Sequence, residues 1–168
     1  MAPNLRLNAV AFISPQNHPI LIRTFTKQDE GAIKYHYIAH TSLDVIEERA
    51  HTHIASSKSS ECYLGLLYST EDVAVYGYMT PLKVKIVLAA ALTDAVARDV
   101  DLNMIFKALH MAYYSAISNP FLVPPDTSGA VHDSARPVLA GSPKWKQFRR
   151  RVDEIARIVG NPATTTAP

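Results

Sequence analysis

The chain has 168 residues, of which 48% are hydrophobic and 19% charged, and its formal net charge is +2. This length suffices for one compact domain with a buried core. The nearly neutral charge gives the chain as a whole no electrostatic footprint for nucleic acid or acidic lipid, so any charge argument has to be local. Cys62 is the only cysteine, which excludes an internal disulfide and a multi-cysteine zinc site and favours a reducing, cytoplasmic compartment.

The first third of the chain predicts a hairpin followed by a helix. Two short apolar runs, Leu5 to Ile13 and Ile20 to Phe25, flank the turn-forming sequence SPQNHP, which is typical of a β-hairpin. From Tyr35 to Ile54 apolar residues recur at spacings of three and four. This periodicity predicts an amphipathic helix.

Three strands of a meander are predicted next, at 62–68, 73–80 and 86–92, because apolar runs there alternate with turn-forming residues. The last of them is the longest unbroken apolar run in the chain. It is far shorter than the roughly 20 residues that cross a bilayer. We therefore expect no transmembrane segment, and the first residues have no pattern typical of a targeting leader.

The second half of the chain predicts two more helices around a loop. Helical spacing runs from Leu102 to Ile117, with Asp99 or Asp101 available as an N-terminal cap. The proline-rich stretch at about 122–143 has no apolar period and is predicted to be a long surface insert. A final helix should begin near Ser142 and Pro143 and end at Gly160. We thus expect one domain over residues 1–160 and a flexible tail over 161–168.

The order of these elements predicts the fold class. Strands such as YLGLLY and IVLAAAL are apolar at both odd and even positions, so helices should cover both faces of the sheet. A hairpin, a helical crossover and a meander then give an α/β (α+β) sandwich. Its five-stranded, mainly antiparallel sheet should carry the first helix on one face and the later two on the other.

Several sequence strings carry a family resemblance. HTSLD followed by VIEE, then YLGLLYSTEDVAVYGYMT, then a helix ending in SNPF, resembles the sedlin family of the TRAPP vesicle-tethering complex. The resemblance runs from about Leu7 to Phe121 and implies a longin-like, profilin-like sandwich. The proline-rich insert and the basic last helix depart from the family pattern, although the apolar spacing of Trp145, Phe148 and Val152 looks like the family's final helix.

This resemblance implies a function without catalysis. Sedlin-type subunits are non-enzymatic adaptors that help to assemble a complex whose core is a guanine-nucleotide exchange factor for Rab-type GTPases. The expected partners are other TRAPP subunits and, indirectly, a Rab-type GTPase, with no nucleic acid, no small-molecule substrate and no cofactor. The expected location is cytoplasmic, peripheral at endoplasmic reticulum and Golgi membranes, in vesicle-mediated transport.

The predicted protein-binding residues lie on the first helix. Asp44 belongs to the family's Leu-Asp-hydrophobic-hydrophobic-acid motif, and the resemblance implies that this surface contacts other subunits. Glu47 and Glu48 join it by proximity, on the side opposite the apolar stripe. An exposed acidic face without a partner is the plain alternative.

Other chemistry receives little support from the sequence. His36, His40 and Asp44 are spaced by four residues, but over two helical turns they span roughly 11 Å, too far for all three to bind one metal ion. Cys62 begins an apolar strand and is interpreted as a small core residue rather than a nucleophile. No Gly-x-Ser-x-Gly elbow, P-loop or dinucleotide motif is present.

The last helix provides the alternative hypothesis. Its region carries six basic residues against Asp153 and Glu154, from Lys144 to Arg157. A basic amphipathic helix can lie on an anionic membrane or contact an acidic partner. The alternative function is therefore a free-standing membrane-surface module, whereas the Asn119-Pro120-Phe121 sequence is interpreted as a helix stop rather than a peptide motif.

Overall fold

The computed structural model describes residues 5–26, 31–55, 62–92, 97–120 and 143–160. Along the chain the elements are β1 (Leu7–Ile13), β2 (Pro19–Thr24), α1 (Gly31–Ala55), β3 (Tyr63–Ser69), β4 (Val73–Met79), β5 (Lys85–Ala91), α2 (Asp99–Ile117), the 3-10 turn η3 (Pro143–Trp145) and α3 (Lys146–Gly160). The predicted order of two strands, one helix, three strands and two helices is confirmed.

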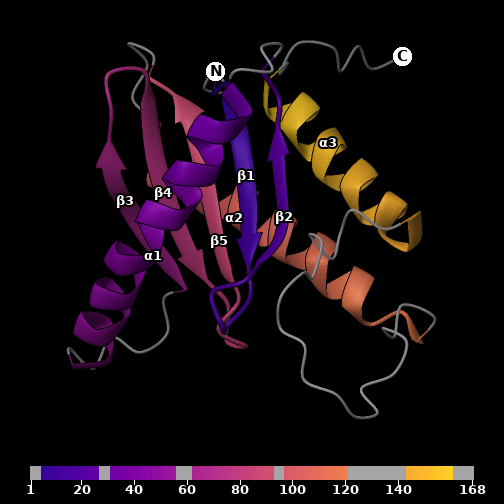
Figure 1. Ribbon diagram of the computed structural model, residues 1–168, viewed down its shortest axis with the longest axis horizontal. Coiled ribbons are helices and arrows are strands. Elements are labelled where there is room, and N and C mark those ends of the chain that lie inside the picture. Colours follow the sequence, from indigo (N-terminus) through magenta and orange to yellow (C-terminus); the bar gives the residue numbers. More distant parts are fainter. Residues whose placement is uncertain (1–4, 27–30, 56–61, 93–96, 121–142, 161–168) are drawn as a thin grey trace.

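All strand pairs in the sheet are antiparallel, and the strand order is β2-β1-β5-β4-β3. The hairpin β1–β2 and the meander β3–β5 are each built from chain neighbours. They join where β1 pairs with β5, with Ala11 opposite Val87. Because β2 and β3 are the two edges, α1 has to cross one face of the sheet to connect them (Figure 1).

Each face of the sheet carries its own core cluster. On the α1 side, Leu43 and Ile46 of the helix pack with Val75 and Val87 of the sheet. On the other side, α2 and α3 bury the residues Phe106, Leu109, Phe148 and Val152 against Phe12, Ile86 and Leu88. The predicted sandwich, with one helix on one face and two on the other, is therefore confirmed (Figure 1).

The edge strand β3 departs from the expectation that both faces are covered. β1 is buried along its whole length and β5 along all but its last residue. In β3, by contrast, Leu66 is exposed, although Leu64 and Leu67 are buried toward α1. The register of β3 against β4 shifts twice, between Tyr63 and Gly65 and between Leu66 and Tyr68. Such irregularities are common at sheet edges, where pairing ends.

The predicted cap of α2 is wrong. The N-cap residue is Arg98, which makes no side-chain cap hydrogen bond, and both aspartates lie inside the first turn. Asp99 accepts a hydrogen bond from the Tyr63 hydroxyl at 2.9 Å, and Asp101 pairs with Arg98 at 2.8 Å. Both carboxylates still suit the positive end of the helix dipole. The helix ends at Ile117, just before the predicted stop at Asn119 and Pro120.

The C-terminal helix begins as predicted, with the turn at Pro143 leading into α3. Phe148, Val152 and Ala156 are its buried residues, and Trp145 packs edge-on against Phe148. The predicted insert, apart from its last residue, and the predicted tail lie outside the described residues. Within the described ranges, no helix is long and apolar enough to cross a membrane.

Candidate interaction surface on helix α1

The solvent side of α1 combines apolar and acidic side chains in one row. Apolar residues at spacings of three and four bury the opposite side of the helix, so the residues between them must face outward. We call this row the α1 outer face, and its exposed members are Ile33, Tyr37, His40, Asp44, Glu47, Glu48 and His51.

Two large apolar side chains stand out in this row. Ile33 is 80% exposed and Tyr37 is 71% exposed. Tyr37 lies two helical turns before Asp44 on the same side of the helix. Exposed aromatic residues are enriched in protein interfaces, where a few anchor residues, often Trp, Tyr or Arg, carry most of the binding free energy.

All three predicted binding residues are exposed, but only two of them lack a partner among the described residues. Asp44 and Glu48 are exposed, and neither carboxylate forms a hydrogen bond or ion pair with another described residue. Their negative charges are therefore available to a basic partner. This is the geometry that the sequence predicts for Asp44.

Glu47 has internal partners that the sequence did not predict. The Lys85 ammonium, whose side chain is almost completely buried, donates to the Glu47 carboxylate at 3.0 Å and also to Asn17. Asn17, in the β1–β2 turn, donates its amide to the same carboxylate at 3.0 Å. Glu47 thus ties α1 to the hairpin and to β5, because a buried ammonium without a partner would be costly.

Glu47→Gln is expected to make stability less dependent on pH. Hydrogen bonds from Asn17 and Lys85 hold the pKa of Glu47 below its ordinary value of 4.5. A carboxyl with a lowered pKa stabilises the fold above its unfolded-state pKa and loses this contribution as the pH falls through the folded pKa. The urea midpoint of wild type should therefore exceed that of Glu47→Gln at neutral pH, and the gap should narrow in acid.

Glu48→Gln is the matched control for this measurement. Its carboxylate has no described partner, so the substitution should lower the neutral-pH midpoint much less than Glu47→Gln does. A gap between wild type and Glu47→Gln that stays the same in acid would contradict an ionic role for Glu47.

The inner side of α1 is fixed to the sheet by polar contacts as well as by the core. The Arg49 guanidinium donates to the carbonyl oxygen of Leu64 at 2.7 Å. Tyr68 donates its hydroxyl hydrogen to the carbonyl oxygen of Ile38 at 3.0 Å, beside the buried Ser42. These contacts hold α1 against edge strand β3, so the α1 outer face is presented by a rigid element.

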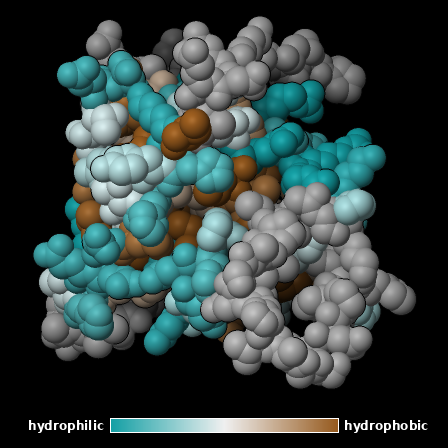
Figure 2. All heavy atoms as spheres, viewed as in Figure 1, coloured by the Kyte–Doolittle hydropathy of each residue, from teal (hydrophilic) through white to brown (hydrophobic). Residues whose placement is uncertain are grey.

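A groove of about 190 Å³ lies beside the α1 outer face, between the helix and the β1–β2 hairpin. Its apolar floor is made by Ile13, Ile22, Ala39 and Leu43, and the imidazoles of His36 and His40 line it. Apolar surface framed by hydrophilic side chains is visible near the middle of this face (Figure 2). His40 belongs to both surfaces, so a partner that contacts Asp44 can also place an apolar side chain in the groove.

The other candidate groups have structural surroundings. Among the described residues, no set of three or more His, Cys, Asp or Glu is arranged to hold a metal ion. The half-buried Cys62 packs against the core cluster on the α2 side, as the sequence predicts. Asn119 and Pro120 are exposed, and Phe121 lies outside the described residues.

The sheet order, the helix layers and the exposed outer face define a longin-like α/β sandwich. A family model described as sedlin matches residues 12–135. The trafficking protein particle complex subunit 2-like protein of Bos taurus is 42% identical over 118 residues, which are 70% of this chain and 84% of that protein. The chain belongs to the sedlin family.

Two further relatives come from other organisms. The protein of the same description from Dictyostelium discoideum is 40% identical over 123 residues, covering 71% of this chain and 84% of that protein. The one from Taeniopygia guttata is 38% identical over 134 residues, covering 79% of this chain and 93% of that protein. The similarity therefore extends over most of the length of these relatives.

Proposed function

We propose that this chain is a non-catalytic adaptor subunit of a trafficking protein particle complex. Its relatives from Bos taurus and Dictyostelium discoideum are named as subunits of that complex, and family membership makes the same role the natural one for this chain. In this proposal the complex is a tether and a Rab guanine-nucleotide exchange factor. It acts at endoplasmic reticulum and Golgi membranes, and its exchange chemistry belongs to other subunits.

The α1 outer face is the proposed contact with those subunits. The observation that carries this assignment is the row in which exposed Ile33 and Tyr37 precede the exposed carboxylate of Asp44. An apolar ring can be desolvated by a partner, while the carboxylate fixes register by pairing with an Arg or Lys. The neighbouring groove offers space for one further apolar anchor.

Glu48 and Glu47 have different roles within this proposal. Glu48 adds an exposed negative charge that favours association with a basic partner surface. Glu47 contributes mainly by holding the helix, since Lys85 and Asn17 already engage its carboxylate. We therefore rank Asp44 first among the proposed binding residues.

Native purification of the tagged full-length chain tests the proposed function. Mass spectrometry should find other TRAPP subunits at stoichiometric amounts, and the recovered complex should catalyse nucleotide exchange on a Rab-type GTPase. The isolated chain should lack this activity. Recovery of the chain alone, or exchange by the isolated chain, would contradict the proposal.

A further inference from the structure

The solvent side of α2 exposes an apolar row that no described element covers. We call it the α2 outer row, and it consists of Val100, Met104, Lys107, Met111 and Tyr114, spaced by four and three residues. Met104 is 65% exposed and Met111 is 63% exposed. Several large apolar side chains in one exposed row indicate contact with something apolar.

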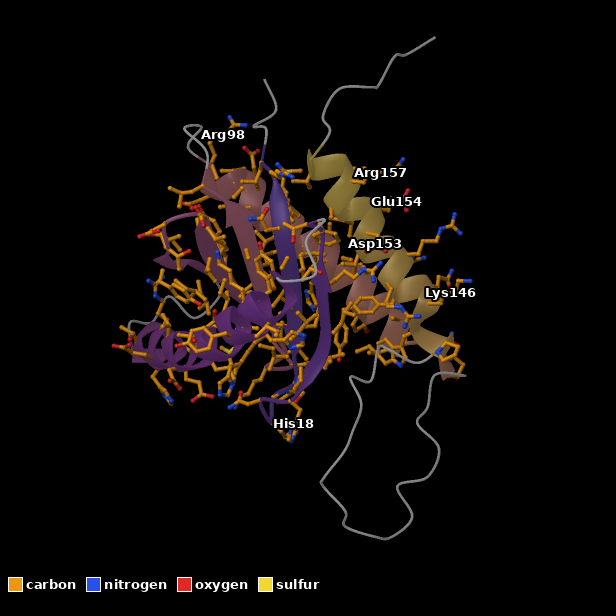
Figure 3. All side chains as sticks on the ribbon, turned by 45° about the horizontal axis from the view of Figure 1, so that its top comes forward. His18, Arg98, Lys146, Asp153, Glu154 and Arg157 are labelled. Carbon is orange, nitrogen blue, oxygen red and sulfur yellow. The ribbon has the colours of Figure 1, made fainter. Side chains whose placement is uncertain are left out.

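The neighbouring helix α3 is basic on its outer side. Its sequence contains five basic residues and two acidic ones. One of the acidic residues, Asp153, is engaged by Arg23 of β2 through two hydrogen bonds at 2.7 and 2.8 Å. Lys146, Arg150 and Arg157 are exposed, and Lys146 and Arg157 point away from the body of the molecule, as does Glu154 (Figure 3).

The two rows belong to one surface. α2 and α3 bury their inner sides in the same core cluster, so their outer sides face away from the sheet together. Arg151 of α3 donates a hydrogen bond to Ser115 of α2 at 2.9 Å. Ser115 follows Tyr114 directly, so this bond joins the basic side of α3 to the apolar row of α2.

We infer that the α2/α3 layer is a peripheral binding surface for an anionic lipid bilayer. Protruding methionine and tyrosine side chains can enter the boundary between headgroups and acyl chains, while the surrounding cations attract anionic headgroups. Lys107 lies within the apolar row and would reach the headgroups by extending its side chain. The inference does not depend on the proposed adaptor role.

The shape of this layer favours a bilayer over a protein partner. A protein interface usually places its anchor side chains in pockets. The hollow between α2 and α3, next to Ser115 and Arg151, measures only about 50 Å³ and holds no more than a few water molecules. The larger groove lies on the opposite layer, beside α1. A fluid membrane needs no pocket, only side chains that protrude.

Co-flotation of the purified full-length chain with vesicles tests this inference. The chain should bind vesicles of phosphatidylcholine mixed with phosphatidylserine, and it should bind pure phosphatidylcholine vesicles much more weakly. Binding to the anionic vesicles should fall as salt is added, because salt screens the attraction between charges. Free phosphoserine should compete poorly, since it lacks acyl chains.

Arg150→Glu tests whether vesicle binding depends on the α2/α3 layer or only on the net charge of the chain. Each cation near an anionic membrane contributes about fivefold to partitioning, so a charge reversal should weaken binding by roughly 25-fold. Lys34→Glu on α1 makes the same charge change on the opposite layer, where Lys34 forms only an exposed pair with Asp72. It should leave vesicle binding nearly unchanged. Circular dichroism of both variants checks that they are folded.

Substitutions at Met111 test the apolar contribution. Met111→Asn should weaken partitioning about tenfold, whereas Met111→Leu should retain it, because insertion depends on apolar area. Absence of binding to anionic vesicles would overturn the inference. So would equal losses in Arg150→Glu and Lys34→Glu, or binding to an acidic protein without binding to vesicles.

Discussion

Asp44→Tyr is expected to leave the chain folded while greatly reducing its recovery of TRAPP subunits. Asp44 is exposed and has no described ion-pair partner, so its carboxylate contributes little to the stability of the isolated chain. In an interface, by contrast, removing one member of a desolvated charge pair costs about 2 to 5 kcal/mol, largely by leaving the partner's charge unpaired. Quantitative mass spectrometry after native purification measures the loss.

Two matched variants show whether the loss of recovery comes from the missing charge, from the bulk of the new ring, or from the position of the substitution. Asp44→Asn removes the charge and keeps the shape, so it should also lose recovery if the carboxylate pairs with a cation. Glu154→Tyr makes the same kind of change on exposed α3, on the opposite layer, and should recover the subunits normally. Normal recovery by Asp44→Tyr, with an unchanged circular dichroism spectrum, would remove Asp44 from the proposed interface.

Tyr37→Ala examines the apolar half of the same surface. The ring is 71% exposed, so its loss should hardly change the melting temperature of the isolated chain. If the ring is an anchor, recovery of the complex should fall as it does for Asp44→Tyr. If Tyr37→Ala still recovers the complex, the interface is restricted to the part of α1 that follows Tyr37.

Local patterns in the sequence predicted most elements, because helix and strand periodicities depend on near neighbours. The burial of Leu102, Phe106 and Leu109 along α2 follows directly from their spacing. The pairing of β1 with β5 has no such signal, since β2, α1, β3 and β4 separate the two strands in the sequence. The exposure of Leu66 was missed because a run of apolar residues does not reveal that its strand is an edge.

The candidate surface likewise contains features that the sequence predicts and features that it does not. Asp44 was placed correctly on the exposed side of α1 because helical spacing separates it from the buried stripe. The pairing of Glu47 with Lys85 could not be predicted, since the partners are 38 positions apart in sequence and meet only when α1 crosses the sheet. Tyr37 could have been found, because it shares the helical side of Asp44, but tyrosine is intermediate in burial, so its residue type alone does not indicate exposure.

The α2 cap shows how one local preference can mislead. Aspartate is a favourable N-cap residue, and Asp99 and Asp101 stand at the expected place in the sequence. In the fold, the Tyr63 hydroxyl and the Arg98 guanidinium engage these two carboxylates instead. Both carboxylates thus bind other side chains, and Arg98 occupies the N-cap position.

Leu109→Ala is expected to lower the free energy of unfolding by roughly 2 to 5 kcal/mol. The Leu109 side chain is fully buried, in the cluster that joins α2 and α3 to the sheet. Truncation removes its contacts and leaves a cavity that the rings of Phe106 and Phe148 can fill only in part, because their own packing on Tyr78 and Phe12 is already fixed. Urea denaturation should show a lower midpoint with an unchanged slope.

Met111→Ala tests whether this loss arises from burial rather than from helix propensity. It truncates an exposed residue two positions along the same helix, and its effect should stay within about 0.5 kcal/mol. Residues two positions apart on a helix point to different sides. Leu109 can therefore face the sheet only while Met111 faces away from it. Equal midpoints for wild type and Leu109→Ala would mean that α2 is rotated, and Met111 would then become the destabilising site.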